Sequence, residues 1–217
     1  MRITLTIFII LFLLGCGSSV DNTSANSTIS LQLRTYYYSL TTETYDNEED
    51  SHYVYETREY DTQEVALLLI DLWEYCQNDG WIDRATMNMQ THILPLIQWA
   101  RQKGIFIIYS PHHHEMSSLI TVQNGEMVVE NEWELADMLH DMGITTILYA
   151  GYATNMCVLF RPDGMVRMDW NGFTVHLIRD CSIAVETRET LATEGAYHAA
   201  LNIIDTRYGS TLLEELN

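Results

Sequence analysis

Cys157 lies where a cysteine thiol can become a nucleophile. It belongs to residues 151–158, which read Gly-Tyr-Ala-Thr-Asn-Met-Cys-Val and follow an apolar run, residues 145–150, typical of a buried strand. We expect a helix to begin near Cys157, so the unpaired backbone N–H groups and the dipole of that helix would favour an anion there. Because the thiolate is the reactive form of cysteine, this position indicates a group that can attack a carbonyl carbon.

Asp71 is the second residue whose position indicates chemistry. It directly follows a strand-like apolar run, Val65–Ile70. Asp71 could therefore lie beside the thiol of Cys157. Considered singly, Asp71 fits a helix cap and Cys157 fits a buried structural thiol. Together, at the ends of two predicted strands, they favour a cysteine-dependent hydrolase.

The order of the predicted elements would bring these two residues together. Apolar strand runs alternate with helical periods, which predicts an α/β fold with a Rossmann-like, doubly wound parallel sheet between two layers of helices. In such sheets the ligand site lies beyond the carboxyl ends of the strands. That rim would carry Asp71, residues 110–114, residues 151–157 and Asp180. The strands are expected at residues 65–70, 105–109, 144–150 and 173–178, and the helices at 84–103, 131–142, from 157 onward and 188–207.

The N-terminus predicts export and lipid attachment. A charged start, a short apolar run and small residues before Cys16 are typical of a lipoprotein signal peptide over residues 1–15. Cys16 would then become the lipidated first residue. An ordinary signal peptide or an uncleaved anchor is the alternative. We therefore expect a protein of the bacterial cell envelope, anchored to a membrane by lipid and lying outside the cytoplasm.

The remaining chain divides into three predicted segments. Residues 16–30 are rich in Ser, Thr and Asn and predict a polar tether. Residues 31–62 hold two runs of β-forming residues and predict an N-terminal β-hairpin, with a tyrosine-rich ligand face as the alternative. Residues 63–217 suffice for one hydrolase domain with a full core.

Charge and cysteine content exclude several classes of partner. The chain has 11 Lys and Arg against 30 Asp and Glu, a net charge of −19. This balance argues against nucleic acid and anionic membrane surfaces as partners, so membrane attachment would depend on the lipid. Besides Cys16, the cysteines are Cys76, Cys157 and Cys181, and this odd number leaves at least one free thiol. No C-x-x-C pair or zinc-finger spacing occurs, and we expect neither a metal nor a cofactor.

Asp71 and the motif Gly-x-x-Thr-Asn-x-Cys-Val at residues 151–158 resemble those of the isochorismatase-like cysteine hydrolases, a superfamily that includes nicotinamidases and N-carbamoyl amide hydrolases. The resemblance covers about residues 63–215. It implies that Cys157 is the nucleophile and Asp71 its general base. It also implies a cis peptide between Tyr152 and Ala153, an oxyanion hole formed by the N–H groups of Ala153 and Cys157, a small-molecule substrate and a homo-oligomer.

The chain departs from this superfamily at its third catalytic residue, a lysine between the aspartate and the cysteine. The one lysine here, Lys103, precedes a glycine at a predicted helix C-terminus, on the wrong edge of the sheet. No arginine lies between Lys103 and Cys157, so histidines are the only side chains in that interval able to become cationic. His112 and His114 share a face in an extended chain and could replace the lysine or bind substrate. A solvated loop, or a metal site with Asp71, is the alternative.

The other candidate residues have less specific positions. Trp73, Tyr152 and Trp133 could line a pocket or pack in the core, and Asp180 and Glu186 are expected to hold loops.

We expect a hydrolase that cleaves a C–N, amide-type bond of a small molecule through a thioester. The first alternative is a catalytically silent relative that binds a ligand or partner, which the missing lysine favours. The second is another reaction on the same fold, such as vinyl ether hydrolysis, against which Cys157 argues.

Overall fold

The computed structural model describes residues 27–37, 51–73, 79–112 and 114–217. The predicted signal peptide, Cys16, most of the predicted tether, Cys76 and His113 lie outside these ranges. Within them, no helix has the length and apolar character needed to cross a membrane.

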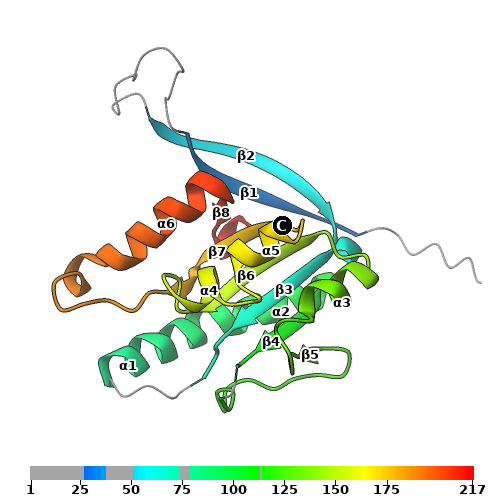
Figure 1. The fold of residues 1–217 in the computed structure, drawn as a ribbon, viewed down its shortest axis with the longest axis horizontal. Helices are drawn as coiled ribbons and strands as arrows, with labels where there is room; N and C mark the ends of the chain where they lie inside the picture. Colours follow the sequence, from blue (N-terminus) through cyan, green and yellow to red (C-terminus); the bar gives the residue numbers. More distant parts are fainter. Residues whose placement is uncertain (1–26, 38–50, 74–78, 113) are drawn as a thin grey trace, which may run out of the picture.

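The described residues form one eight-stranded sheet covered by helices (Figure 1). Its strands are β1 (Thr28–Tyr37), β2 (His52–Asp61), β3 (Val65–Ile70), β4 (Phe106–Ser110), β5 (Met127–Val128), β6 (Thr146–Tyr152), β7 (Thr174–Ile183) and β8 (Ser210–Thr211). In space they run in the order β2-β1-β8-β7-β6-β3-β4-β5. The strands from β8 to β5 pair in parallel, whereas β1 is antiparallel to both of its neighbours. The predicted doubly wound α/β fold is confirmed.

Helices cover both faces of the central strands, which explains why β3 is buried at all six positions. One face is covered by α1 (Asp79–Asn88), a π-helical turn (Met89–Ile93) and α2 (Leu94–Lys103). The other face is covered by α3 (Leu135–Asp141), α4 (Cys157–Phe160), α5 (Met165–Trp170) and α6 (Gly195–Arg207). Short 3-10 turns lie at Thr62–Glu64, Leu191–Thr193 and Leu213–Glu215.

Several helices are shorter than the sequence pattern predicted. The predicted helix at residues 131–142 begins only at Leu135, because the amide of Asn131 accepts the backbone N–H of Trp133 and holds a turn there. The predicted helix at residues 188–207 begins only at Gly195. Turns bonded through side chains therefore precede both helices.

The N-terminal hairpin extends the sheet beyond β8. β1 and β2 pair along their whole length, from Thr28 opposite Asp61 to Tyr37 opposite His52. β1 begins at Thr28, three positions before the predicted boundary at residue 31. Its inner side chains are buried in the same core cluster as the side chains of α1 and α2, whereas nearly all of β2 is exposed at the edge (Figure 1).

The register of the central strands assembles the predicted rim. Ile70, the last residue of β3, pairs with Ser110 on β4 and with Gly151 on β6. Gly151 has φ +111°, and a Cβ atom there would lie 2.1 Å from the carbonyl oxygen of Ile70. Only glycine allows β6 to approach β3 this closely, immediately before Asp71 and the segment that leads to Cys157.

Candidate active site

Asp71 lies at the carboxyl end of β3 with 3% of its surface exposed. Its backbone has φ +50°, in the left-handed region, and its N–H donates to the carbonyl of Ser110 at 3.0 Å. This turn keeps the carboxylate at the rim. Its Oδ1 atom accepts a hydrogen bond from Nη1 of Arg161 at 2.6 Å.

Cys157 begins α4 and is partly exposed. Burial, then the hydrogen bond to Asp71 and the charge of that carboxylate, raise the pKa of Cys157 to about 12. The positive charge of Arg161 and the N–H of Ala153 act in the opposite direction. The sequence suggested a thiolate stabilised by a helix N-terminus, but α4 has only four residues, and burial and the carboxylate of Asp71 favour the protonated thiol instead.

The segment before Cys157 brings backbone donors to the sulfur. The peptide bond between Tyr152 and Ala153 is cis. The N–H of Ala153 hydrogen-bonds the Cys157 sulfur, and no acceptor among the described residues takes the N–H of Cys157 itself. Both N–H groups therefore lie at the thiol, where charge would develop on an attacked carbonyl.

Arg161 is the cation of this site, and the sequence analysis missed it. Its side chain is 9% exposed, and Nη2 donates to Oε1 of Glu132 at 2.8 Å and to Oγ of Ser110 at 2.9 Å. Its Nε lies 3.2 Å from Oδ1 of Asp163. Arg161 lies four residues after Cys157, outside the interval between Lys103 and Cys157 to which the sequence argument was limited. Its spacing of one helical turn from the cysteine is the signal that could have indicated it.

Two further carboxylates surround the guanidinium of Arg161. Asp163 is fully buried, and burial raises its pKa although the charge of Arg161 opposes the shift. Its Oδ2 accepts the hydroxyl of Ser110 at 2.5 Å. Burial would raise the pKa of Glu132 as well, but the hydrogen bond with His112 and the charge of Arg161 lower it. The site is thus a cluster of acidic groups around one guanidinium.

The predicted histidines lie at the rim, but the structure places them differently from a lysine substitute. Nδ1 of His112 lies 2.5 Å from Glu132, and 45% of the His112 side chain is exposed. The ring of His114 lies 5.1 Å from the ring of Trp73. Histidines are indeed the only side chains between Lys103 and Cys157 that can become cationic, but Arg161, beyond the cysteine, is the residue whose positive charge contacts Asp71. Within the described ranges, no three His, Cys, Asp or Glu side chains form a group that could hold a metal ion.

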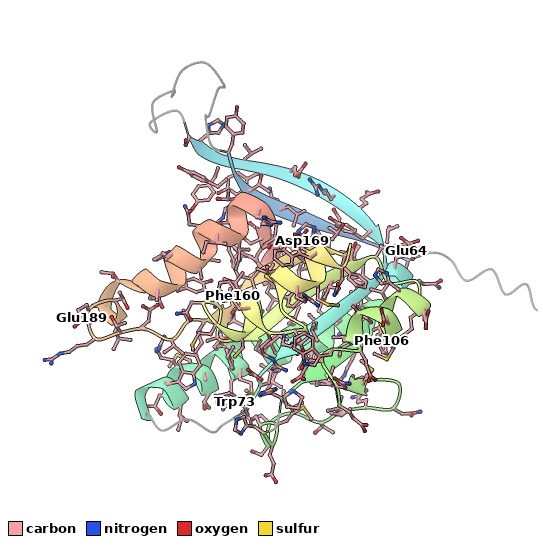
Figure 2. The ribbon with its side chains drawn as sticks, in the orientation of Figure 1. Glu64, Trp73, Phe106, Phe160, Asp169 and Glu189 are labelled. Atoms are coloured by element: carbon pink, nitrogen blue, oxygen red, sulfur yellow. The ribbon has the colours of Figure 1, made fainter. Side chains whose placement is uncertain are left out.

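The aromatic candidates occupy three different environments. Trp73 is half-buried at the rim, next to His114. Tyr152 is a core residue rather than a pocket residue, because it is 2% exposed and its hydroxyl donates to the carbonyl of Ala85 at 2.9 Å. Trp133 is 68% exposed and lines a surface cavity of about 400 Å³. The other lining residues of that cavity are Phe160, labelled in Figure 2, Arg161, Pro162, Val166, Arg167 and Trp170.

The remaining candidates have structural roles. Asp180 accepts the backbone N–H of Leu213 at 3.0 Å, and Glu186 accepts the N–H groups of Ala196 and Tyr197 at the start of α6, so both hold loops as predicted. Cys181 is buried, and burial raises its pKa well above the usual value. Lys103 ends α2, directly before the left-handed Gly104 and at the opposite edge from the rim.

Comparison with known proteins supports the fold. No protein-family model matches the chain, and no curated protein matches it in sequence. Among solved structures, a cysteine hydrolase from Pseudomonas syringae pv. phaseolicola superposes with a TM-score of 0.59 at 16% identity, over 71% of this chain and 92% of that one. A nicotinamidase from Staphylococcus aureus gives 0.53 at 16% identity, over 69% and 98%. An octameric hydrolase of unknown specificity from Escherichia coli gives 0.52 at 16% identity, over 72% and 78%. At these identities the likeness establishes the fold shared with isochorismatase-like hydrolases.

Proposed function

We propose that this protein is a cysteine-dependent hydrolase that cleaves a C–N, amide-type bond of a small molecule. The observation that carries the proposal is the position of the Cys157 thiol beside the buried carboxylate of Asp71, where burial and then that carboxylate raise the pKa of the thiol. The two residues come from the ends of adjacent parallel strands, β6 and β3, where this fold class binds ligands. The neighbours named as a cysteine hydrolase and a nicotinamidase have the same fold.

In the proposed reaction Asp71 relays two protons, one from the Cys157 thiol to the leaving nitrogen and one from water back to the sulfur. As the sulfur attacks the carbonyl carbon, the thiol proton passes to Asp71, and the carbonyl oxygen becomes an oxyanion. Asp71 then gives that proton to the leaving nitrogen as the C–N bond breaks and a thioester remains. Water attacks the thioester and gives a proton to Asp71, which returns it to the sulfur as the C–S bond breaks.

The electrostatics of the site fit a base that acts at the moment of attack. Because the pKa of Cys157 is raised to about 12, very little thiolate exists near neutral pH. A base in contact with the thiol removes this obstacle, since the proton leaves as the C–S bond forms. The N–H groups of Ala153 and Cys157 are the proposed oxyanion donors, and fixed donors of this kind contribute about 3–4 kcal/mol each to transition-state stabilisation.

The test is a screen of primary amides, N-carbamoyl amines and simple esters with the purified protein. We expect hydrolysis that C157A abolishes and that D71N lowers by at least about a hundredfold. Mass spectrometry of quenched reactions should find the acyl group on the peptide that carries Cys157. C181A is the matched control and should retain turnover, because Cys181 is buried. Turnover that survives C157A would disprove the nucleophile.

A catalytically silent ligand-binding protein is the second candidate. The observation that favours it is the guanidinium bonded to Asp71 where related enzymes have a lysine. In this case no amide or ester is hydrolysed, and a thermal-shift screen with the same compounds still finds a stabilising ligand. C157A would then bind that ligand as tightly as the wild type does.

The proposal includes a lipid anchor at Cys16, which would attach the protein to a membrane of the bacterial cell envelope. Its support is the lipobox-like sequence Leu-Leu-Gly-Cys at residues 13–16. Expression of wild type and C16S in a bacterial host, followed by fractionation, should place only the wild type in the membrane fraction. Equal partitioning of the two proteins would disprove the anchor.

We also propose a homo-oligomer, supported by the octameric assembly of the Escherichia coli neighbour. Light scattering coupled to size exclusion on the lipid-free C16S protein should give a mass that is a multiple of the monomer. A monomeric mass at micromolar concentration would contradict the proposal.

A further inference from the structure

The side chain of Arg161 is buried, whereas most arginine side chains in proteins are exposed. Four groups of the rim surround its guanidinium: the carboxylates of Asp71, Glu132 and Asp163, and the hydroxyl of Ser110. Placing an arginine there costs desolvation energy, which only close partners offset. An arginine held so completely at the rim must contribute to the chemistry of that rim or to its assembly.

The same short helix carries the thiol and the guanidinium. α4 begins at Cys157 and ends at Phe160, and Arg161 is its C-cap residue, whose backbone N–H donates to the carbonyl of Cys157 at 3.3 Å (Figure 1). Residues four positions apart lie on one side of a helix. The same helical turn therefore places both the Cys157 sulfur and the Arg161 guanidinium next to the carboxylate of Asp71.

The charges of the surrounding carboxylates indicate the role of the Arg161 guanidinium. Asp71 is 97% buried and lies in one cluster with the acidic Glu132 and Asp163. Like charges in a buried cluster repel one another, and this repulsion would drive the three carboxylates apart. One positive charge at 2.6 Å from Asp71 opposes this effect. His112 faces the same cluster through Glu132 from the exposed side.

We propose that Arg161 is the positioning residue of the site: it holds the carboxylate of Asp71 toward Cys157 and places, from the end of the nucleophile's own helix, the positive charge that stabilises the sulfur as its proton leaves. Arg161 stays protonated throughout and exchanges no proton. In the first step the thiol proton goes to Asp71 while the S–C bond forms, and the guanidinium holds one carboxylate oxygen so that the other can receive the proton. The effect on turnover rests on the proposed function, but the effect on the thiol does not.

The experiment measures how fast iodoacetamide alkylates Cys157, by mass spectrometry, at pH 9 and across pH 7–10. Because the charge of Arg161 lowers the pKa of Cys157, R161Q should react at least about threefold more slowly at pH 9. R161K keeps the positive charge but loses the fork of donors, so it should react faster than R161Q and no faster than wild type. R207Q removes an exposed arginine of α6 and should match the wild type. Where a substrate is known, R161Q should lower kcat with little change in KM.

Two outcomes would overturn the proposal. One is a folded R161Q protein, by circular dichroism, whose Cys157 reacts as fast as in wild type or faster. The other, which decides the matter if R161Q does not fold, is an R161K protein that reacts tenfold more slowly than wild type. The expected alkylation pattern without any amide turnover would refute the proposed hydrolase and leave the role of Arg161 intact.

Discussion

Asp71 influences Cys157 in two opposed ways at the residue scale. Its charge and hydrogen bond raise the pKa of the thiol, yet its carboxylate is the base that makes the thiol useful. We therefore predict that D71N accelerates alkylation of Cys157 near pH 8, by about tenfold for each unit by which the thiol pKa falls, while it lowers turnover by at least about a hundredfold. Alkylation rates measured by mass spectrometry, with the buried Cys181 as internal control, test this. Slower alkylation in D71N would show that Asp71 does not contact the thiol.

The sequence indicated Cys157 and Asp71 because each follows a strand of a parallel sheet, and the strand ends of such a sheet meet at one rim. It did not indicate Arg161. Arg161 and Asp71 are 90 positions apart in the sequence. Because arginines are common on surface helices, the presence of one there does not indicate a contact with a distant carboxylate. Which carboxylate a guanidinium reaches depends on how the elements pack, and single-sequence patterns do not report that packing.

At the element scale, Gly151 decides whether β6 can lie against β3. A Cβ atom there would come within 2.9 Å of three backbone atoms of Ile70, and backbone cannot move aside as a side chain can. We predict that G151A destabilises the protein by more than about 4 kcal/mol, or prevents folding. Gly172 is the control, because it also has positive φ, +95°, but open space at its Cβ position. G172A should cost only about 1–2 kcal/mol.

Urea unfolding monitored by tryptophan fluorescence compares the two glycine variants. Equal losses in G151A and G172A would mean that positive φ, and not the close approach of β6 to Ile70, makes Gly151 necessary.

The hairpin is joined to the core through His176 on β7. Nδ1 of its ring donates to the carbonyl of Tyr208 at 2.6 Å, so Nε2 of the neutral ring accepts the hydroxyl of Tyr60 on β2 at 2.8 Å. Burial lowers the pKa of His176 to about 4, against about 6.5 in the unfolded chain. Between these values the unfolded state binds a proton that the native state does not, so the stabilising contribution of His176 falls as pH decreases.

We therefore predict that wild type is more stable than H176Q at pH 7.5 and that this difference shrinks at pH 5, by about 2 kcal/mol at most. Denaturant unfolding at both pH values measures it. H198Q, which changes an exposed histidine on α6, should show no such pH dependence. A difference that stays constant or grows toward pH 5 would mean that His176 is protonated in the native state.

The sequence predicted the parts of the fold that leave a clear pattern of apolar residues along the chain. β3 is apolar at all six positions because helices cover both of its faces, and this leaves a clear run in the sequence. Helix starts were predicted less well, because Asn131 bonds a backbone N–H in the turn before α3 and Glu186 bonds the first backbone N–H groups of α6. Tyr152 shows the same limit, since its bond to α1 depends on the tertiary arrangement.

For the whole molecule, the dominant electrostatic fact is the net charge of −19. Folding brings these carboxylates closer together than they are in the unfolded chain, so their mutual repulsion opposes the compact state. Salt screens exposed charges over about 10 Å at 0.1 M, whereas the buried contacts of Arg161 are screened much less.

We predict that raising sodium chloride from 20 to 300 mM increases the melting temperature of the lipid-free C16S protein by roughly 2–5 °C. Scanning calorimetry measures this, and potassium chloride at equal ionic strength should give the same rise. A melting temperature that falls with salt would mean that attractive surface ion pairs outweigh the repulsion.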